Sequence, residues 1–368
     1  MKLNKGYKYR IYLNDMQKEL IDKTIGSCRF VYNYILGKAI NYYNANKKNM
    51  KLSIETEMKK EFEWLKAIDS IAIQQSRRDL ETSYKNFFKK QNKFPKFKSK
   101  RKSKNSYRTI NQKGTIRIDN NLLKIPKVGY IKINFHRELP QDYNICSATI
   151  SEKNGKYYAS ILVGYEKEIY PINAIKFLGL DYSQPDFYVD SEKRKPNFQK
   201  PKRDSQKRLT KEQRKLSRMV KYSNNYYKQK LKIAKLEEHI SNQRKDFLHK
   251  LSFNLSNEYD AICVEDINLK VMSQCLSLGR NISDNGFGMF RIMLEYKLKE
   301  KGKYFVKINK WFPSSKTCRH CGAINSELKL GEMEWTCPSC NTIINRDINA
   351  AKNIKEEGFR IYTDGIAV

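Results

Sequence analysis

The sequence lacks any apolar run of about 18 residues, the shortest length expected of a membrane-spanning helix. Its opening residues, MKLNKGYKYRIYL, also lack the apolar core of a secretory signal peptide. A disulfide framework is not expected either, because four of the eight cysteines lie scattered in apolar or mixed segments, as reduced thiols do. We therefore expect a soluble cytoplasmic protein with no membrane partner and no obligate protein partner. The scattered cysteines are Cys28, Cys146, Cys263 and Cys275.

Acidic residues are scarce relative to basic ones. The 368-residue chain has 73 Lys and Arg against 39 Asp and Glu, a formal net charge of +34. This excess is far more than solubility requires and is typical of proteins that neutralise phosphates. Nucleic acid is therefore the expected partner. The length allows two or three domains, each with its own core.

The first half of the chain combines strand patterns with helix patterns. Residues 5–13 alternate basic with aromatic or aliphatic side chains, which predicts a strand with one buried face. Residues 14–46 and 52–90 show helical spacing instead, with Asn14 as the expected N-cap. Residues 107–170 return to short alternating strands broken by Gly, Asn and Pro. The pattern predicts helices inserted between one strand and the sheet that it joins.

The second half predicts a separate α/β domain that begins near residue 173. Strands alternate with helices there, and this order favours a parallel sheet. Residues 209–258 contain few helix breakers, so one long helical stretch is expected. The other expected elements are the strand IKFLGLDYS with its hairpin partner FYVDSE, the strands AICVED and YFVKIN, a helix over 286–301 and a last helix from about Ile348.

A paired cysteine motif predicts a zinc ribbon over residues 318–340. Two C-x-x-C pairs are separated by 15 residues, the spacing of a tetrahedral four-thiolate site. Four thiolates leave no open position for water, so the zinc would be structural. His320 lies inside the first pair and is expected to be a bystander. The predicted ligands are Cys318, Cys321, Cys337 and Cys340.

Three acids lie at the ends of predicted elements. Asp181 ends IKFLGLD, Glu265 ends DAICVE, and Asp347 lies where the last helix begins. Because the carboxyl ends of the strands form the functional edge of an open α/β sheet, these acids are expected to converge. The alternative is that each acid merely caps a strand or helix in solvent.

Converging carboxylates with no basic partner nearby repel one another unless cations lie between them. Oxygen-only ligands favour Mg²⁺ or Mn²⁺. Two such ions can activate a water and stabilise the leaving oxygen in phosphodiester cleavage. The three acids together therefore predict a metal-dependent nuclease.

A basic tract with aromatic residues runs from residue 82 to 118, with 13 Lys or Arg and no Asp or Glu. Such a tract is typical of a surface that follows a nucleic-acid backbone. A solvated loop is the alternative, and Arg77 and Arg78 have local acids, Asp79 and Glu81, as other partners. A second basic stretch, 193–235, fits a charged surface helix or, equally well, a lid that faces a nucleic-acid duplex. The predicted nucleic-acid contacts are Gln75, Arg78, Lys85, Lys96, Lys98, Lys100, Arg101, Lys102 and Lys316.

These segments resemble TnpB proteins, the transposon-encoded relatives of type V CRISPR effectors. GLDYS, VEDINLK and RDINAAKNI are similar to the three catalytic motifs of their RuvC-like nuclease domain. WFPSSKTCRHCG and NGFGMFRIMLEYKLKEKG are similar to the stretch between the second and third motifs. KGYKYRIYLNDMQ, CRFVYNYIL and FPKFKSKRKSKNSYR resemble the N-terminal half, so the resemblance spans nearly the whole chain.

The resemblance implies a multi-domain α/β architecture. A wedge-like β-barrel would comprise residues 1–13 and 96–172, with a helical recognition domain inserted over 14–95. An RNase H-like RuvC domain would comprise 173–317 and 341–368, with the zinc ribbon of residues 318–340 inserted in it.

The implied activity is that of an RNA-guided DNA endonuclease. Such a protein binds a guide RNA from the transposon end, recognises a short motif beside double-stranded target DNA, and cuts both strands with one site. Asp181, Glu265 and Asp347 would be the catalytic, magnesium-binding acids. The protein would work in a prokaryotic cytoplasm, at the nucleoid when it is bound to DNA.

The sequence departs from the family pattern at Asn345, where an Asp often precedes the Arg-Asp pair. No catalytic acid is lost by this change. Two rival functions remain: a catalytically silent RNA-guided repressor, and a transposase acting directly on transposon ends. The chain lacks the His-x-His motif of Tyr-based transposases, and its intact acids argue against a silent repressor.

Overall fold

A computed structural model describes residues 1–101, 103–198, 201–268, 286–329 and 331–365. The chain divides into two compact units, Met1–Glu168 and Ile169–Val368. This division falls a few residues before the boundary that the sequence predicted, between residues 172 and 173. Within the described ranges, no helix is both long enough and apolar enough to cross a membrane.

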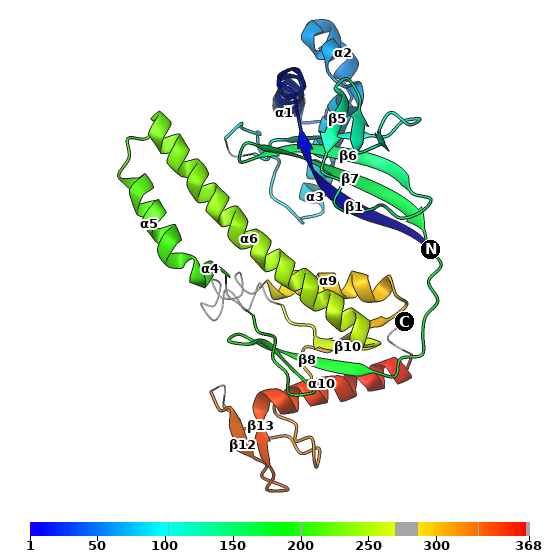
Figure 1. The fold of residues 1–368 in the computed structure, drawn as a ribbon, viewed down its shortest axis with the longest axis vertical. Helices are drawn as coiled ribbons and strands as arrows, with labels where there is room; N and C mark the ends of the chain where they lie inside the picture. Colours follow the sequence, from blue (N-terminus) through cyan, green and yellow to red (C-terminus); the bar gives the residue numbers. More distant parts are fainter. Residues whose placement is uncertain (102, 199–200, 269–285, 330, 366–368) are drawn as a thin grey trace. The chain divides into compact units, whose positions relative to one another are not determined.

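The first unit contains a seven-stranded antiparallel sheet (Figure 1). Its strands are β1 (Lys2–Tyr12), β2 (Ser106–Ile110), β3 (Arg117–Asp119), β4 (Leu122–Ile125), β5 (Gly129–Ile133), β6 (Asn144–Lys153) and β7 (Lys156–Glu166). The order is β2-β6-β7-β1-β5-β4-β3. In β1 the buried side chains of Tyr7, Tyr9 and Ile11 alternate with more exposed ones, which confirms the predicted strand. Among the described residues β2 and β3 do not pair with each other, so hydrogen bonds do not close the sheet into the predicted barrel.

The helices of this unit come between β1 and β2, as predicted. They are α1 (Asp15–Asn46), α2 (Glu55–Glu61), η1 (Glu63–Ala67) and α3 (Ser70–Phe88). Asn14 caps α1 as expected, because its side chain accepts from the backbone N–H of Gln17 at 2.8 Å. The predicted helical region 52–90 is broken twice. The second break precedes Asp69, whose carboxylate accepts from the backbone N–H of Ile71 and starts α3.

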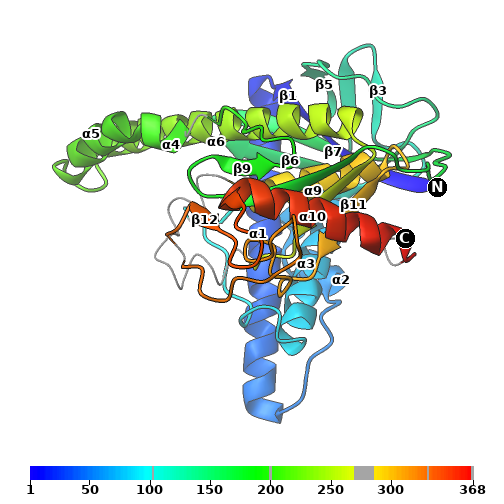
Figure 2. The same cartoon turned by 90° about the horizontal axis from the view of Figure 1, so that it is seen from below.

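The second unit is a sheet between two layers of helices. Its sheet strands are β8 (Phe177–Ser183), β9 (Phe187–Asp190), β10 (Ala261–Glu265) and β11 (Tyr304–Ile308), and its helices are α4 (Pro201–Asp204), α5 (Gln206–Ser217), α6 (Asn224–Glu258), α9 (Phe287–Lys299) and α10 (Arg346–Thr363). The strand order is β11-β10-β8-β9, with β8, β10 and β11 parallel and β9 antiparallel. Leu178 and Ile262 face α6 and α9, whereas Phe177 and Cys263 face α10 (Figures 1 and 2).

The helical stretch predicted over 209–258 is interrupted, because the chain turns between α5 and α6. Tyr222 has a left-handed backbone with φ 71°, and the Ser223 side chain then caps α6 by accepting from the backbone N–H of Tyr226. The two helices pack antiparallel as a hairpin (Figure 1). The sequence signal for the break is weak, since the turn contains no Gly or Pro.

Two glycines allow α10 to approach the sheet closely. A Cβ on Gly179 of β8 would lie 2.0 Å from the backbone oxygen of Ala351. A Cβ on Gly358 of α10 would lie 2.2 Å from the sulfur of Cys263 on β10. Any larger side chain at either position would push the helix and the sheet apart.

Candidate functional site

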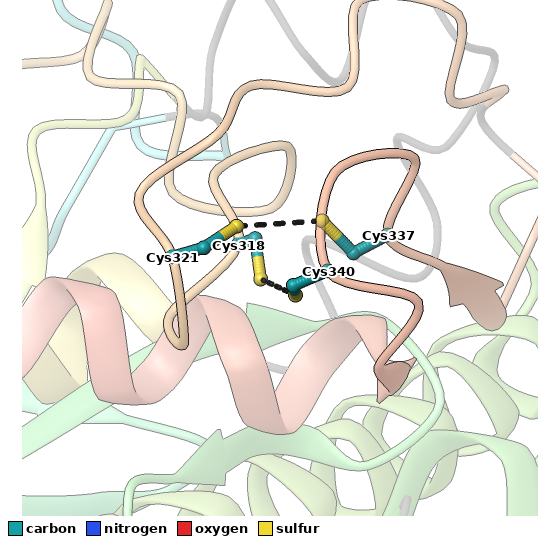
Figure 3. Close-up of side chains that lie close together, drawn as sticks. All are labelled: Cys318, Cys321, Cys337 and Cys340. Atoms are coloured by element: carbon teal, nitrogen blue, oxygen red, sulfur yellow. Dashed lines mark hydrogen bonds between the residues drawn. The ribbon is translucent and has the colours of Figure 1, made fainter.

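The four predicted zinc ligands lie together. Their sulfur atoms are all within 4.8 Å of one another, and two cross-pair distances are 3.7 Å, between Cys318 and Cys340, and 3.6 Å, between Cys321 and Cys337 (Figure 3). Tetrahedral zinc with Zn–S bonds of about 2.3 Å requires sulfurs about 3.8 Å apart. The donor set therefore fits a tetrahedral zinc ion. His320 is exposed and is not part of the cluster, in agreement with the bystander role.

A small core supports these cysteines. The hairpin of β12 (Glu334–Thr336) and β13 (Ile343–Asn345) brings Trp335 and Ile344 against the buried Cys318 and Cys337. Hydrogen bonds from the Thr342 hydroxyl and backbone lower the pKa of Cys340, which favours its thiolate, whereas the pKa of Cys321 in the same cluster is raised by burial and by the other thiols.

Asp181 and Glu265 lie side by side toward the carboxyl ends of the neighbouring parallel strands β8 and β10. In the parallel pairing of β8 with β10, Leu180 is opposite Val264, and each acid follows directly. The expectation that Asp181 ends its strand is wrong, because β8 continues to Ser183 and Asp181 pairs with Val189 of β9. Glu265 does end β10, as predicted.

Asp347 reaches the same region from the other side of the sheet. It lies in the first turn of α10, which begins at Arg346, two residues before the predicted start near Ile348, and α10 packs along β8. Asn345 caps α10, with its side chain accepting from the backbone N–H of Ile348 at 3.2 Å. The family departure at this position therefore keeps an effective N-cap.

The three carboxylates influence one another electrostatically. Burial raises the pKa of Asp181 well above its ordinary value, and the neighbouring carboxylates of Glu265 and Asp347 raise it further. Burial also raises the pKa of Glu265, while a hydrogen bond from Ser314 opposes that rise. The assumption that no basic group is near was wrong, since the positive charge of Arg346 acts on Asp181.

The carboxylates are less tightly gathered than the thiolates. Within the described part of the chain, the four cysteines are the one group of three or more His, Cys, Asp and Glu whose ligand atoms converge as a metal ion requires. Asp266, the acid that follows Glu265, is largely exposed and accepts from Arg291 at 2.9 Å.

Sequence reasoning missed three polar residues around this edge. Ser314 is buried, and its hydroxyl donates to the Glu265 carboxylate. Asn349 and Asn353 are also buried, one turn apart on α10. The available signal was a pair of amides at i and i+4 on a helix that otherwise buries Ala and Ile, because that spacing puts both on one face.

The predicted nucleic-acid contacts fall into separate groups. Gln75 is 3% exposed inside α3, so its side chain is not available for the nucleic-acid contact predicted for it. Lys98 directs its ammonium over the Tyr32 ring at 3.9 Å, and Lys316 donates to the backbone oxygen of Ser326 at 2.9 Å. Lys102 lies outside the described residues. The exposed members are Arg78, Lys85, Lys96, Lys100 and Arg101.

The neighbouring arginine is occupied within the protein. Arg77 pairs with Glu55 and Glu81, which agrees with the local pairing that the sequence left open for this region. Asp79 pairs with Arg108 at 3.2 Å rather than with Arg78. Of Arg77 and Arg78, Arg78 is the exposed one, so it is the one that can contact nucleic acid.

Helix α5 presents a cationic face that the list of predicted contacts omitted. Its sole acid, Glu212, is buried against α6, where it accepts from Gln229 at 2.8 Å and Lys232 at 3.1 Å. The other face therefore carries no acid. It lines a shallow groove with Gln206, Lys207, Thr210, Lys211, Arg214, Lys215 and Arg218.

Three family models match the chain. Residues 160–276 match a family described as "Probable transposase", and residues 287–354 match "Cas12f1-like, TNB domain". Residues 1–48 match a "Helix-turn-helix domain", although the structure there consists of β1 and the single helix α1.

Two curated relatives match nearly the whole chain. A Streptomyces pristinaespiralis protein named "Putative RNA-guided DNA endonuclease" is 34% identical over 97% of this chain and 90% of its own length. An Escherichia coli K12 protein named "Putative RNA-guided DNA endonuclease InsQ" is 30% identical over 99% of this chain and 95% of its own.

A solved structure shares the fold. It is titled "Cryo-EM structure of the Cas12f1-sgRNA-target DNA complex", and the match covers 96% of this chain and 99% of that chain with a TM-score of 0.61. The sequence identity is 12%, so this likeness concerns the mixed α/β fold.

Proposed function

This chain belongs to the TnpB family, and on that premise we propose that it is a transposon-encoded, RNA-guided DNA endonuclease. The main support is that strand pairing sets Asp181 beside Glu265 and that Asp347 lies on the helix packed along β8, where the charges of Glu265 and Asp347 both raise the pKa of Asp181. A repressor has no need of a site in which half-buried acids repel one another. A hydrolytic metal site does.

We propose magnesium as the ion of this site. The donor set consists of carboxylate oxygens from three elements, which suits Mg²⁺ or Mn²⁺ rather than zinc. When bound, such ions activate a water for attack on the phosphodiester and stabilise the leaving oxygen. The protein's part is to hold three acids close together where the positive charge of Arg346 only partly offsets their effect on Asp181.

The partners proposed for this chain are a guide RNA and double-stranded target DNA. The net charge of +34 and the exposed side chains of Arg78, Lys85, Lys96, Lys100 and Arg101 support contacts with phosphates. The α5 face adds a second basic surface whose one acid is turned inward. Sequence specificity would come mainly from base pairing with the guide.

The test is to purify the protein from cells that carry its own transposon end, to sequence the RNA that co-purifies, and to incubate the complex with Mg²⁺ and a library of matching DNA targets. Cleavage beside one short motif that is lost in Asp181→Ala supports the proposal. Bound RNA without cleavage favours the guided repressor, and cleavage of transposon ends without RNA favours a transposase. Either result overturns the proposal.

A further inference from the structure

The loop between β11 and the first cysteine pair connects the two candidate metal sites. Ser314 lies in this loop with 5% of its surface exposed, and its hydroxyl donates to Oε1 of Glu265. Cys318, the first thiolate, follows four residues later. The loop thus contacts an acid at one end and supplies a zinc ligand at the other.

Two amides of α10 hold this loop in place. Nδ2 of Asn353 donates to the backbone oxygens of Ser314 and Thr317, both at 2.8 Å. Nδ2 of Asn349 donates to the same two oxygens at 3.5 and 2.7 Å. Oδ1 of Asn349 accepts in turn from the backbone N–H of Arg319 at 3.2 Å. The same helix begins with Asp347, so one rigid element carries one acid and fixes the loop that contacts another.

Packing alone does not explain these residues. Asn349 and Asn353 are 5% and 4% exposed, and Asn has a lower helix propensity than Ala or Leu. Burial of an amide is unfavourable unless its donors are satisfied. Here each side-chain nitrogen has two N–H groups and two carbonyl acceptors, so the donors of both amides are satisfied by the loop.

We propose that Ser314 is a positioning residue for Glu265, and that Asn349 and Asn353 set its location from the helix that carries Asp347. This inference rests on the proposed function, because it takes Glu265 to be a metal-binding acid. A hydrogen bond from Ser314 fixes one carboxylate oxygen and would leave the other to bind a metal ion. Outer partners of metal ligands commonly act in this way.

The test measures Mn²⁺ binding to the full-length protein with its guide RNA, by electron paramagnetic resonance titration, and measures cleavage rate against Mg²⁺ concentration. In Ser314→Ala we expect the Mn²⁺ dissociation constant to rise about 10- to 100-fold. The Mg²⁺ concentration for half-maximal cleavage should rise similarly, while the rate at saturating Mg²⁺ falls less. Ser314→Thr keeps the hydroxyl and should restore most of the affinity. Ser315→Ala is the matched neighbouring control.

Zinc content and melting temperature are measured for every variant, so that only folded proteins are compared. If Ser314→Ala does not fold, Ser314→Cys fills the same space with a much weaker donor and takes its place. Unchanged Mn²⁺ affinity in a folded Ala or Cys variant overturns the positioning role. Unchanged Mn²⁺ affinity in Glu265→Gln shows instead that the proposed carboxylate site is wrong, so the two failures are distinguishable.

Discussion

The two candidate metal sites of the second unit differ in how they are built. The thiolate site takes all four ligands from residues 318–340, and its sulfurs lie within 4.8 Å of one another. The carboxylate site takes its acids from β8, β10 and α10, which are separated by about 80 residues each, and depends on the register of two strands and the approach of a helix. The short cysteine motif therefore positions its own ligands, whereas the positions of the acids depend on the tertiary fold.

The two sites also differ in how their ligands behave, because the thiolates come from one segment and the carboxylates from three separate elements. All four thiolates belong to one short segment, so only this segment has to fold around the ion. The small core of Trp335 and Ile344 supports it. Half-buried carboxylates that lie close together resist ionisation, because burial and the charges of Glu265 and Asp347 all raise the pKa of Asp181. We expect the first site to be stable and closed, and the second to be reactive and dependent on its surroundings. Four experiments test this contrast.

The largest expected effect is on cleavage, from removal of one acid. Glu265→Gln should reduce guided DNA cleavage by about 10³-fold or more, since several kcal/mol of transition-state stabilisation would be lost. RNA binding should persist, as measured by filter binding. Asp266→Asn is the matched control, because this adjacent acid is exposed and pairs with Arg291. Equal losses in both variants would contradict the assignment.

The next effect is loss of the ribbon. Cys337→Ser removes a buried thiolate, so bound zinc should fall from about one ion per chain to near zero and the ribbon should unfold. Zinc is measured by mass spectrometry and folding by hydrogen exchange over residues 318–340. Cys146→Ser, in the other unit, should retain its zinc. Full zinc content in Cys337→Ser would show that these thiolates are not the ligands.

A substitution in β8 should disturb the carboxylate site and leave the thiolate site intact. In Gly179→Ala the new methyl would meet the backbone of Ala351, so α10 must shift, at a cost of about 1–3 kcal/mol. Asp347 would move relative to Asp181, and cleavage should fall, while zinc content stays unchanged. Gly6→Ala in β1 is the control, because nothing lies within 4 Å of its new methyl. Normal cleavage in Gly179→Ala would show that the acids tolerate displacement.

The smallest effect is on stability in magnesium-free buffer. The folded pKa of Asp181 is raised, so the native state holds more protons than the unfolded chain at any pH between the ordinary value of about 4 and the raised value. The free energy of unfolding therefore falls as the pH rises through that window. Asp181→Asn has no proton to lose, so at pH 7 its melting temperature should exceed that of the parent by about 2–4 °C. The difference should shrink toward pH 4, and a lower melting temperature at pH 7 would contradict the repulsion.

Much of the fold could be predicted, because local sequence patterns determine many of its elements. Alternation in β1, the cap at Asn14 and the apolar runs of β8 and β10 all gave correct elements. The break between α5 and α6 was missed, because Tyr222 adopts a left-handed backbone, which its residue type does not predict. The inward direction of Gln75 was missed too, since its burial depends on packing rather than on helical spacing.

The sequence by itself determined the zinc site, because two C-x-x-C pairs contain both the ligands and most of the spacing that brings them together. It also indicated which three acids to examine, since each stands at or near the end of a recognisable element. Only the tertiary structure decided that Asp181 adjoins Glu265, that Ser314 contacts Glu265, and that Asn349 and Asn353 hold the loop of Ser314. These contacts join residues that lie 32 to 84 positions apart, where strand register and helix packing, rather than local pattern, fix the distance between side chains.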